Sequence, residues 1–184
     1  MKFLAFFALS GLLTSAFASP VAVSSSVEKR QDYDALQATL TTLFTDIQKQ
    51  TAIINSTIDA VPENPTDADA TADAAAIAPQ LQTITDLLTA VNGTIVKRAV
   101  VEARFGKPDL FKTLSLIIFE LLFTVKKILF KLGLGKVVIY LTPLVLALKS
   151  LVFSLDLVVG GVLLAVGPTV NELLKAVGLA LIGL

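Results

Sequence analysis

Cysteine and histidine are absent from the 184 residues of this chain. Histidine is the most frequent general base near neutral pH and the commonest metal ligand in proteins. Its absence excludes Ser-His-Asp and Cys-His catalysis and the usual zinc sites. Because cysteine is absent as well, no disulfide can stabilise the fold, and its stability has to come from packed apolar surface, self-association or lipid.

Carboxylates are the remaining candidates for acid–base catalysis. They lie in low-complexity segments or on the predicted outer surfaces of helices. We identify no catalytic residue, no metal ligand and no cofactor site, and we predict that the protein is not an enzyme.

The formal net charge is zero, but the two halves of the chain differ in sign. Residues 31–98 contain nine acids and three bases, a net charge of −6, whereas residues 99–184 contain nine bases and five acids, a net charge of +4. The halves are therefore electrostatically complementary. Nucleic acid is not an expected partner, because the basic half is strongly apolar and has no cluster of Lys and Arg interleaved with aromatic residues.

Residues 1–18 have the features of a secretory signal peptide. Lys2 precedes an apolar run over residues 3–13 that is too short to span a bilayer. The sequence Ala16-Phe17-Ala18 fits the small-x-small cleavage pattern, which places the cut after Ala18. An N-terminal anchor helix is the alternative. We therefore expect a secreted protein that works outside the cytosol or at a cell surface.

Two dibasic pairs are candidate sites of proteolytic processing. Residues 19–30 are a spacer rich in small residues, which we expect to be disordered, and this spacer ends in Lys29-Arg30. Cleavage after Arg30 would remove it as a propeptide. The second pair, Lys97-Arg98, lies at the boundary between the two charged halves, and cleavage there would separate them. The same pair is also compatible with a position inside a continuing helix.

Residues 31–98 are predicted as an acidic helical hairpin. The first helix covers residues 34–61 and ends at Pro62, and its apolar residues lie on one face: Leu36, Leu40, Leu43, Ile47, Ile54, Ile58 and Val61. Residues 66–76 are a low-complexity, weakly helix-forming segment. A second stripe with steps of four and three then begins: Ile77, Leu81, Ile84, Leu88, Val91 and Ile95. Two such helices share only one apolar face, so they need the C-terminal half, another copy or an apolar surface as a third partner.

Two sequons occur in this acidic half, at Asn55-Ser56-Thr57 and Asn92-Gly93-Thr94. Both asparagines fall off the apolar stripes, on the predicted exposed faces of the helices. Asn55 and Asn92 are therefore candidate N-glycosylation sites of an exported protein.

Residues 99–184 are predicted as a basic, hydrophobic helical region that begins with an amphipathic helix over residues 109–132. The apolar sector of this helix is unusually wide. We predict that part of the sector contacts an external apolar surface, namely Leu121, Leu122, Val125, Ile128 and Leu129. The predicted contacts to anionic lipid head groups are Lys126, Lys127 and Lys131.

The chain after residue 136 is almost entirely apolar. Pro143 is predicted to kink a helix, and Gly160-Gly161 and Gly167-Pro168 are predicted to interrupt or end helices. No uncharged run reaches the 18 residues typical of a transmembrane helix, although residues 137–155 would qualify if Lys149 were tolerated. Membrane association through residues 109–184 is thus permitted but not required. The alternative is a set of short helices that bury one another against the hairpin.

Two segments of the acidic half share a pattern of aliphatic, alanine and threonine residues, DYDALQATLTTLFTDIQKQTAIINSTIDAV and AAAIAPQLQTITDLLTAVNGTI, joined by a turn rich in Pro, Asp and Ala. Together with the signal peptide and Lys29-Arg30, residues 31–96 resemble the fungal hydrophobic-surface-binding and cell-wall galactomannoprotein family of small, secreted, all-helical proteins. The resemblance implies adhesion to hydrophobic surfaces or binding of lipid between helices, and no enzymatic activity. Residues 99–184 depart from the family's pattern, which would continue with polar amphipathic helices.

The sequence therefore predicts an all-α fold in which an N-terminal helical hairpin precedes several hydrophobic and amphipathic helices. The predicted function is a secreted, non-enzymatic protein that binds lipid, a membrane or another hydrophobic surface, with self-association as a further option. The alternative is a proprotein that releases a membrane-active C-terminal product after cleavage at Lys97-Arg98. A structural wall component without a specific ligand is a third interpretation.

Overall fold

The computed structural model describes residues 21–96 and 108–178. Within these residues the fold is all-α, with five helices and no strand, which confirms the predicted fold class. The helices are α1 (Val21–Ala60), α2 (Asp67–Val96), α3 (Pro108–Leu132), α4 (Leu134–Val159) and α5 (Val162–Ala176).

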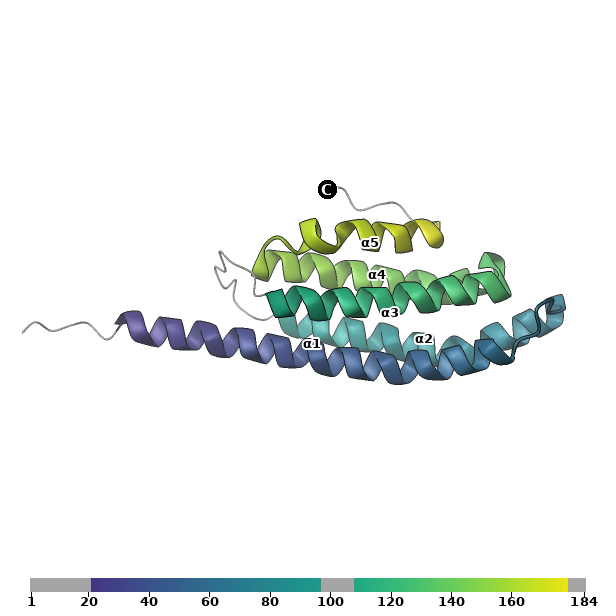
Figure 1. The fold of residues 1–184 in the computed structure, drawn as a ribbon, viewed down its shortest axis with the longest axis horizontal. Coiled ribbons are helices and arrows are strands. Elements are labelled where there is room, and N and C mark those ends of the chain that lie inside the picture. The colour runs from purple at the N-terminus through teal and green to yellow at the C-terminus, as the bar shows by residue number, and fades with distance from the viewer. Residues whose placement is uncertain (1–20, 97–107, 179–184) are drawn as a thin grey trace, which may run out of the picture.

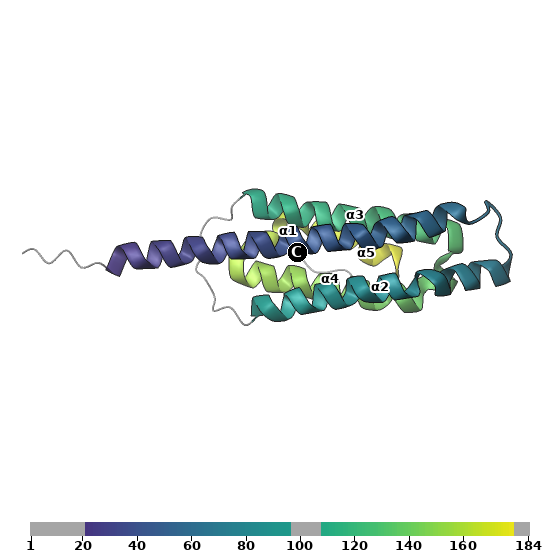
Figure 2. The same cartoon turned by 90° about the horizontal axis from the view of Figure 1, so that it is seen from below.

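The helices form three layers (Figure 1). In the first layer α1 and α2 pair as a hairpin, as predicted. α3 and α4 form the second layer, in which α3 packs mainly on α1 and α4 mainly on α2 (Figure 2). α5 covers α3 and α4 from the side opposite to α1 and α2. The C-terminal half of the chain is therefore the third partner that the N-terminal hairpin requires.

The predicted apolar stripes form the core of the first layer. All seven apolar residues of the first stripe are buried, and so are five of the six in the second stripe, while Val91 is half-buried. Ala70 and Ala74 extend the second stripe toward the start of α2. These residues belong to the same core cluster as buried residues of α3, α4 and α5, so the two halves of the chain share one core.

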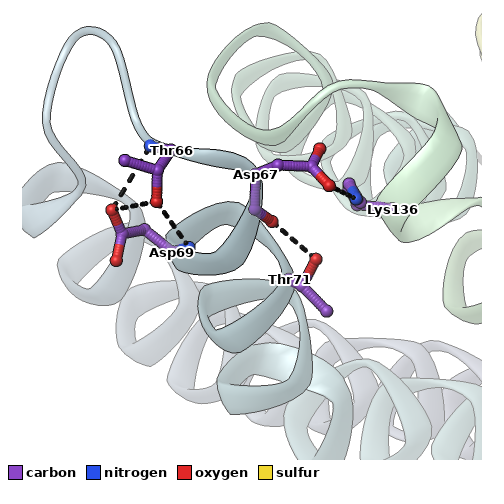
Figure 3. Close-up of polar contacts among 5 residues, drawn as sticks. All are labelled: Thr66, Asp67, Asp69, Thr71 and Lys136. Carbon is purple, nitrogen blue, oxygen red and sulfur yellow. Dashed lines mark hydrogen bonds and ion pairs between the residues drawn. The ribbon is translucent and has the colours of Figure 1, made fainter.

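α2 begins at Asp67 and not near Ile77, so the acidic segment that we described as weakly helix-forming is helical. The reason is a reciprocal cap at its first turn (Figure 3). The Thr66 hydroxyl donates to Asp69 Oδ2 at 2.6 Å and accepts from the Asp69 backbone N–H at 3.2 Å, and the Thr66 backbone N–H also donates to Asp69 Oδ2. Such a capping box satisfies amides that the first turn leaves unpaired. The Asp67 carboxylate also pairs with Lys136 at 2.7 Å, which joins the start of α2 to the start of α4.

α1 begins at Val21, which corrects the prediction that residues 19–30 are a disordered spacer. Residues 21–60 contain neither glycine nor proline. A helix that is stabilised by packing from Leu36 onward can therefore extend toward the N-terminus, since adding a residue to an existing helix costs little compared with nucleation.

The glycine breaks after α3 and α4 agree with the sequence, but the predicted end at Gly167-Pro168 is wrong. Gly133 lies between α3 and α4, and Gly160 and Gly161 separate α4 from α5, with φ values of 77°, 73° and 77°. α5 instead continues through Pro168, just as α2 contains Pro79 and α4 contains Pro143. All three of these prolines are exposed. A proline on the outer side of a helix is tolerated because the carbonyl that loses its partner there can be hydrated.

Candidate functional site

Large apolar side chains that remain exposed are concentrated on the C-terminal helices. Twelve such side chains occur in the described part of the chain, and only Ile53 and Val96 belong to α1 and α2. The other ten lie on α3, α4 and α5: Leu116, Phe119, Phe123, Phe130, Leu134, Ile139, Leu146, Phe153, Leu157 and Leu164. The exposed surface of α1 and α2 consists mainly of Ala, Thr, Ser, Gln and Asp. The α1–α2 layer therefore has a polar exposed surface, whereas large apolar side chains are exposed on α3, α4 and α5.

Six exposed residues of α3 recur at alternating steps of four and three, which places them on one side of the helix. We call this side the α3 outer face; its residues are Lys112, Leu116, Phe119, Phe123, Lys126 and Phe130. The three phenylalanine side chains are 56%, 63% and 86% exposed, in chain order. The α3 outer face thus combines an aromatic stripe with two lysines.

α4 has a comparable stripe without any charge. Its exposed residues follow the same spacing, and we call them the α4 outer face: Ile139, Pro143, Leu146, Ser150, Phe153 and Leu157. On each helix the outer face lies opposite the buried residues. Because α3 and α4 both bury their inner sides in the centre of the bundle, the two outer faces point away from each other.

The structure places the predicted apolar contact face elsewhere. Leu121, Leu122, Val125 and Ile128 are buried in the core, and Leu129 is half-buried against it. These residues cannot contact an external surface while the bundle is closed, so the assignment is corrected for this structure. The reason is that α3 is apolar around most of its circumference, and the inner part of that circumference faces α1, α2, α4 and α5.

Two of the three predicted head-group lysines are directed toward α1. Lys127 is half-buried and pairs with Asp59 at 2.8 Å, and Lys131 donates to the backbone carbonyl of Val61 at 3.3 Å. Lys126 alone among the three is exposed, with a long contact of 3.6 Å to Glu172 of α5. Lys112 is a further exposed lysine of the same face that was not predicted as a head-group contact, although it precedes Leu116 by one helical turn.

Polar contacts between α1 and α3 fix the position of α3 on the hairpin. The Gln37 amide donates to the Thr113 hydroxyl at 2.8 Å, and the Thr51 hydroxyl donates to the Glu120 carboxylate at 2.5 Å. Thr51 is fully buried and occupies the position between Ile47 and Ile54 where the predicted apolar stripe has a gap. These contacts keep one side of α3 turned toward α1. The aromatic side of α3 therefore stays exposed.

Both candidate glycosylation sites lie within helices. Asn55 of α1 and Asn92 of α2 are half-buried, and the Asn92 amide donates to the Ser150 hydroxyl of α4 at 2.9 Å. The Oδ1 atoms of both asparagines are enclosed and accept no hydrogen bond. A glycan attached to either asparagine would therefore have to fit beside a half-buried side chain. Glycosylation stays a prediction.

The predicted processing sites fall mostly outside the part of the chain that the structure describes. Ala18, Lys97 and Arg98 lie outside it. Lys29 and Arg30 lie within the helical range of α1. Cleavage at these sites remains a prediction.

The described residues include no group of three or more acidic residues that could hold a metal ion. A groove of about 420 Å³ lies between α1 and α2 and is lined by Ala38, Thr39, Thr42, Leu43, Asp46, Leu87, Ala90 and Val91. The Asp46 carboxylate pairs with Lys49 at 2.8 Å, so this carboxylate is not a free charged group in the groove.

One helix in the described residues is long and apolar enough to cross a membrane. It is α4, Leu134–Val159, and 39% of its most apolar window is buried inside the bundle. Helices in the core of soluble proteins can have the same length and composition. The finding therefore leaves both membrane association and internal packing compatible with α4.

A comparison with protein-family models found no match, and comparisons with curated proteins and with solved structures found none either. The similarity of residues 31–96 to the fungal hydrophobic-surface-binding family therefore stays a prediction.

Proposed function

We propose that this protein is an exported, non-enzymatic protein that adsorbs to lipid or other hydrophobic surfaces through α3, α4 and α5. The observation that carries the proposal is the location of ten of the twelve exposed large apolar side chains on these three helices. Extended apolar patches on a folded protein mark surfaces that bind a protein, a membrane or another apolar body. The signal-peptide pattern of residues 1–18 supports export.

The exposed area indicates how strong such adsorption would be. With 150 to 250 Å² per aromatic side chain, Phe119, Phe123 and Phe130 leave about 300 to 500 Å² exposed. At about 25 cal/mol per Å², burial of this area would contribute about 7 to 12 kcal/mol. Association costs roughly 4 to 15 kcal/mol in lost translational and rotational freedom, which is similar to this gain. One face therefore supports reversible adsorption, and tight adsorption needs further contacts.

Adsorption to octyl-agarose or polystyrene beads in detergent-free buffer tests the proposal. We expect the secreted chain to be depleted from the supernatant. The fourfold variant Phe123→Ser, Phe130→Ser, Ile139→Ser and Leu157→Ser should adsorb less, because these are strongly exposed positions of the two outer faces. A control variant with Ile53→Ser and Val96→Ser changes the exposed large apolar residues of α1 and α2, and it should adsorb like the wild type. A wild-type chain that stays in solution as a monomer, and adsorbs to neither material, would refute the proposal.

The alternative proprotein function makes a different prediction for the secreted material. α1 packs on α3 and α2 on α4, so the two halves would remain associated after a cut at Lys97-Arg98 unless the shared core opened. Intact-mass measurement under denaturing conditions separates the alternatives. An unbroken chain through residue 98 supports surface adsorption by the whole bundle, whereas fragments that meet at Arg98 support the proprotein.

A further inference from the structure

We propose that the α3 outer face is the docking surface of this protein for an anionic lipid bilayer. The inference depends on the proposed function, and it narrows that function to one helix and one class of surface. It also revises the sequence-based assignment, which placed the contact on the buried side of the same helix.

The shape of the α3 outer face suits the interfacial region of a bilayer. Leu116, Phe119, Phe123 and Phe130 extend over fifteen positions, or fourteen steps, of an uninterrupted helix. At 1.5 Å per residue this stripe is about 21 Å long. A helix with Phe and Leu on one side and Lys beside them lies in the plane of a membrane interface, with the apolar side chains below the head groups.

The lysines of the stripe favour an anionic surface. Lys112 and Lys126 lie on the α3 outer face itself and are exposed. Two acidic groups oppose them in part: Glu172 contacts Lys126 at 3.6 Å, and Asp109 is exposed at the start of α3. The α4 outer face has the same spacing of apolar residues and no charged residue. It is therefore a matched apolar face that lacks the electrostatic component.

The charges of the α1–α2 layer and of the C-terminal helices favour the same orientation. Residues 33–96 of the α1–α2 layer have eight acids and one base, a net charge of −7. Residues 108–178 have seven bases and four acids, a net charge of +3. An anionic membrane repels the α1–α2 layer and attracts residues 108–178, so long-range electrostatics turn the C-terminal helices toward it.

A second copy of this chain is a less suitable occupant of the α3 outer face. A stable dimer buries about 800 Å² on each partner. The aromatic side chains of the stripe expose about 300 to 500 Å². These aromatic side chains therefore supply less than two thirds of the area of a stable dimer, whereas partial insertion into lipid has no minimum area of this kind.

Vesicle sedimentation with the full secreted chain tests the proposal. The probes are vesicles of phosphatidylcholine alone and vesicles with 30% phosphatidylserine. The α3 variant contains Phe119→Ser, Phe123→Ser and Phe130→Ser, and the matched α4 variant contains Ile139→Ser, Leu146→Ser and Leu157→Ser. We expect the α3 variant to lose at least tenfold in affinity for anionic vesicles, and the α4 variant to stay within twofold of the wild type. Circular dichroism and the thermal midpoint establish that each variant is folded.

The double variant Lys112→Gln and Lys126→Gln tests the electrostatic component separately. Each lysine near an anionic surface contributes about fivefold to affinity. We expect a loss between fivefold and 25-fold on anionic vesicles, with Glu172 reducing the share of Lys126, and no change on phosphatidylcholine vesicles.

Three results would overturn the inference. One is equal binding of the wild type to both kinds of vesicle, and another is an equal loss for the α3 and α4 variants. The third is a wild-type dimer that the α3 variant converts to a monomer without a loss of vesicle binding. If vesicles are not bound but octyl-agarose is, the inference fails and the proposed function stands; if neither is bound, both fail.

Discussion

The hydroxyl of Thr51, which is fully buried in α1, donates to the half-buried carboxylate of Glu120 in α3 at 2.5 Å. This hydrogen bond joins the polar hairpin to the amphipathic helix at the middle of their contact. A hydrogen bond to a charged group contributes more than one between neutral groups. Removal of the hydroxyl would leave Glu120 without this donor at the interface.

Two threonine-to-valine substitutions should change stability in opposite directions. Thr51→Val removes the donor to Glu120, and we expect it to lower the free energy of unfolding by about 1 to 3 kcal/mol. Thr124→Val replaces a buried hydroxyl that has no hydrogen-bond partner, and it should raise that free energy by about 1 kcal/mol. Urea denaturation of both variants checks this prediction. The same sign of change in both variants would contradict it.

The inward and outward sides of α3 should respond differently to truncation. Ile128 is fully buried, so Ile128→Ala should destabilise the fold by about 2 to 5 kcal/mol. Phe130 is 86% exposed, and Phe130→Ala should change stability by less than about 0.5 kcal/mol. Thermal and chemical denaturation measure both effects. A larger loss at Phe130 than at Ile128 would show that α3 is rotated relative to this structure.

Glycine-to-alanine substitutions should distinguish the α4–α5 junction from the interior of α2. Gly161 has a φ of 77°, a conformation that costs an L-residue roughly 1 to 2 kcal/mol, so Gly161→Ala should destabilise the fold by about that amount. Gly93 lies inside α2 with open space around its Cα, and Gly93→Ala should stabilise the fold by about 0.5 to 1 kcal/mol. Differential scanning calorimetry reports both changes, and stabilisation by Gly161→Ala would refute the assigned backbone conformation.

Loss of the cap should destabilise the start of α2. Thr66→Ala removes the hydroxyl that caps the first turn together with Asp69, and we expect a loss of about 1 kcal/mol. Thr71 is an exposed neighbour whose hydroxyl donates only to the Asp67 carbonyl within the helix. Thr71→Ala is therefore the control and should have little effect. Amide hydrogen exchange at residues 67–76 should increase in the first variant alone.

Much of the first layer could be predicted from local patterns. The positions of Leu40, Ile47 and Ile84 on apolar stripes are consequences of helical periodicity, and all three are fully buried as expected. The cap of α2 was also visible in the sequence, since Thr66 and Asp69 have the capping-box spacing, but the low complexity of the surrounding segment obscured it. The breaks at Gly133 and at Gly160-Gly161 could be located because they depend on the conformational freedom of single residues, whereas Gly167 lies inside α5.

The candidate surface could not be predicted in the same way. α3 is apolar around most of its circumference, so its periodicity does not distinguish Leu121 and Ile128, which are buried, from Phe123, which is exposed. Lys126 and Lys127 are adjacent in the chain, yet one is exposed and the other pairs with Asp59 of α1. Such differences depend on which helices lie beside α3.

The amino-acid sequence by itself determined the all-helical class, the apolar stripes of α1 and α2 and the opposite charges of the two halves, because these properties depend on residue spacing and composition within short segments. Only the tertiary structure decided that the C-terminal half covers the hairpin, and that the aromatic side of α3 stays outside. That choice is physical in origin: the neighbouring helices can cover only part of a helix that is apolar on nearly every side, and the polar contacts to α1 select which part remains exposed.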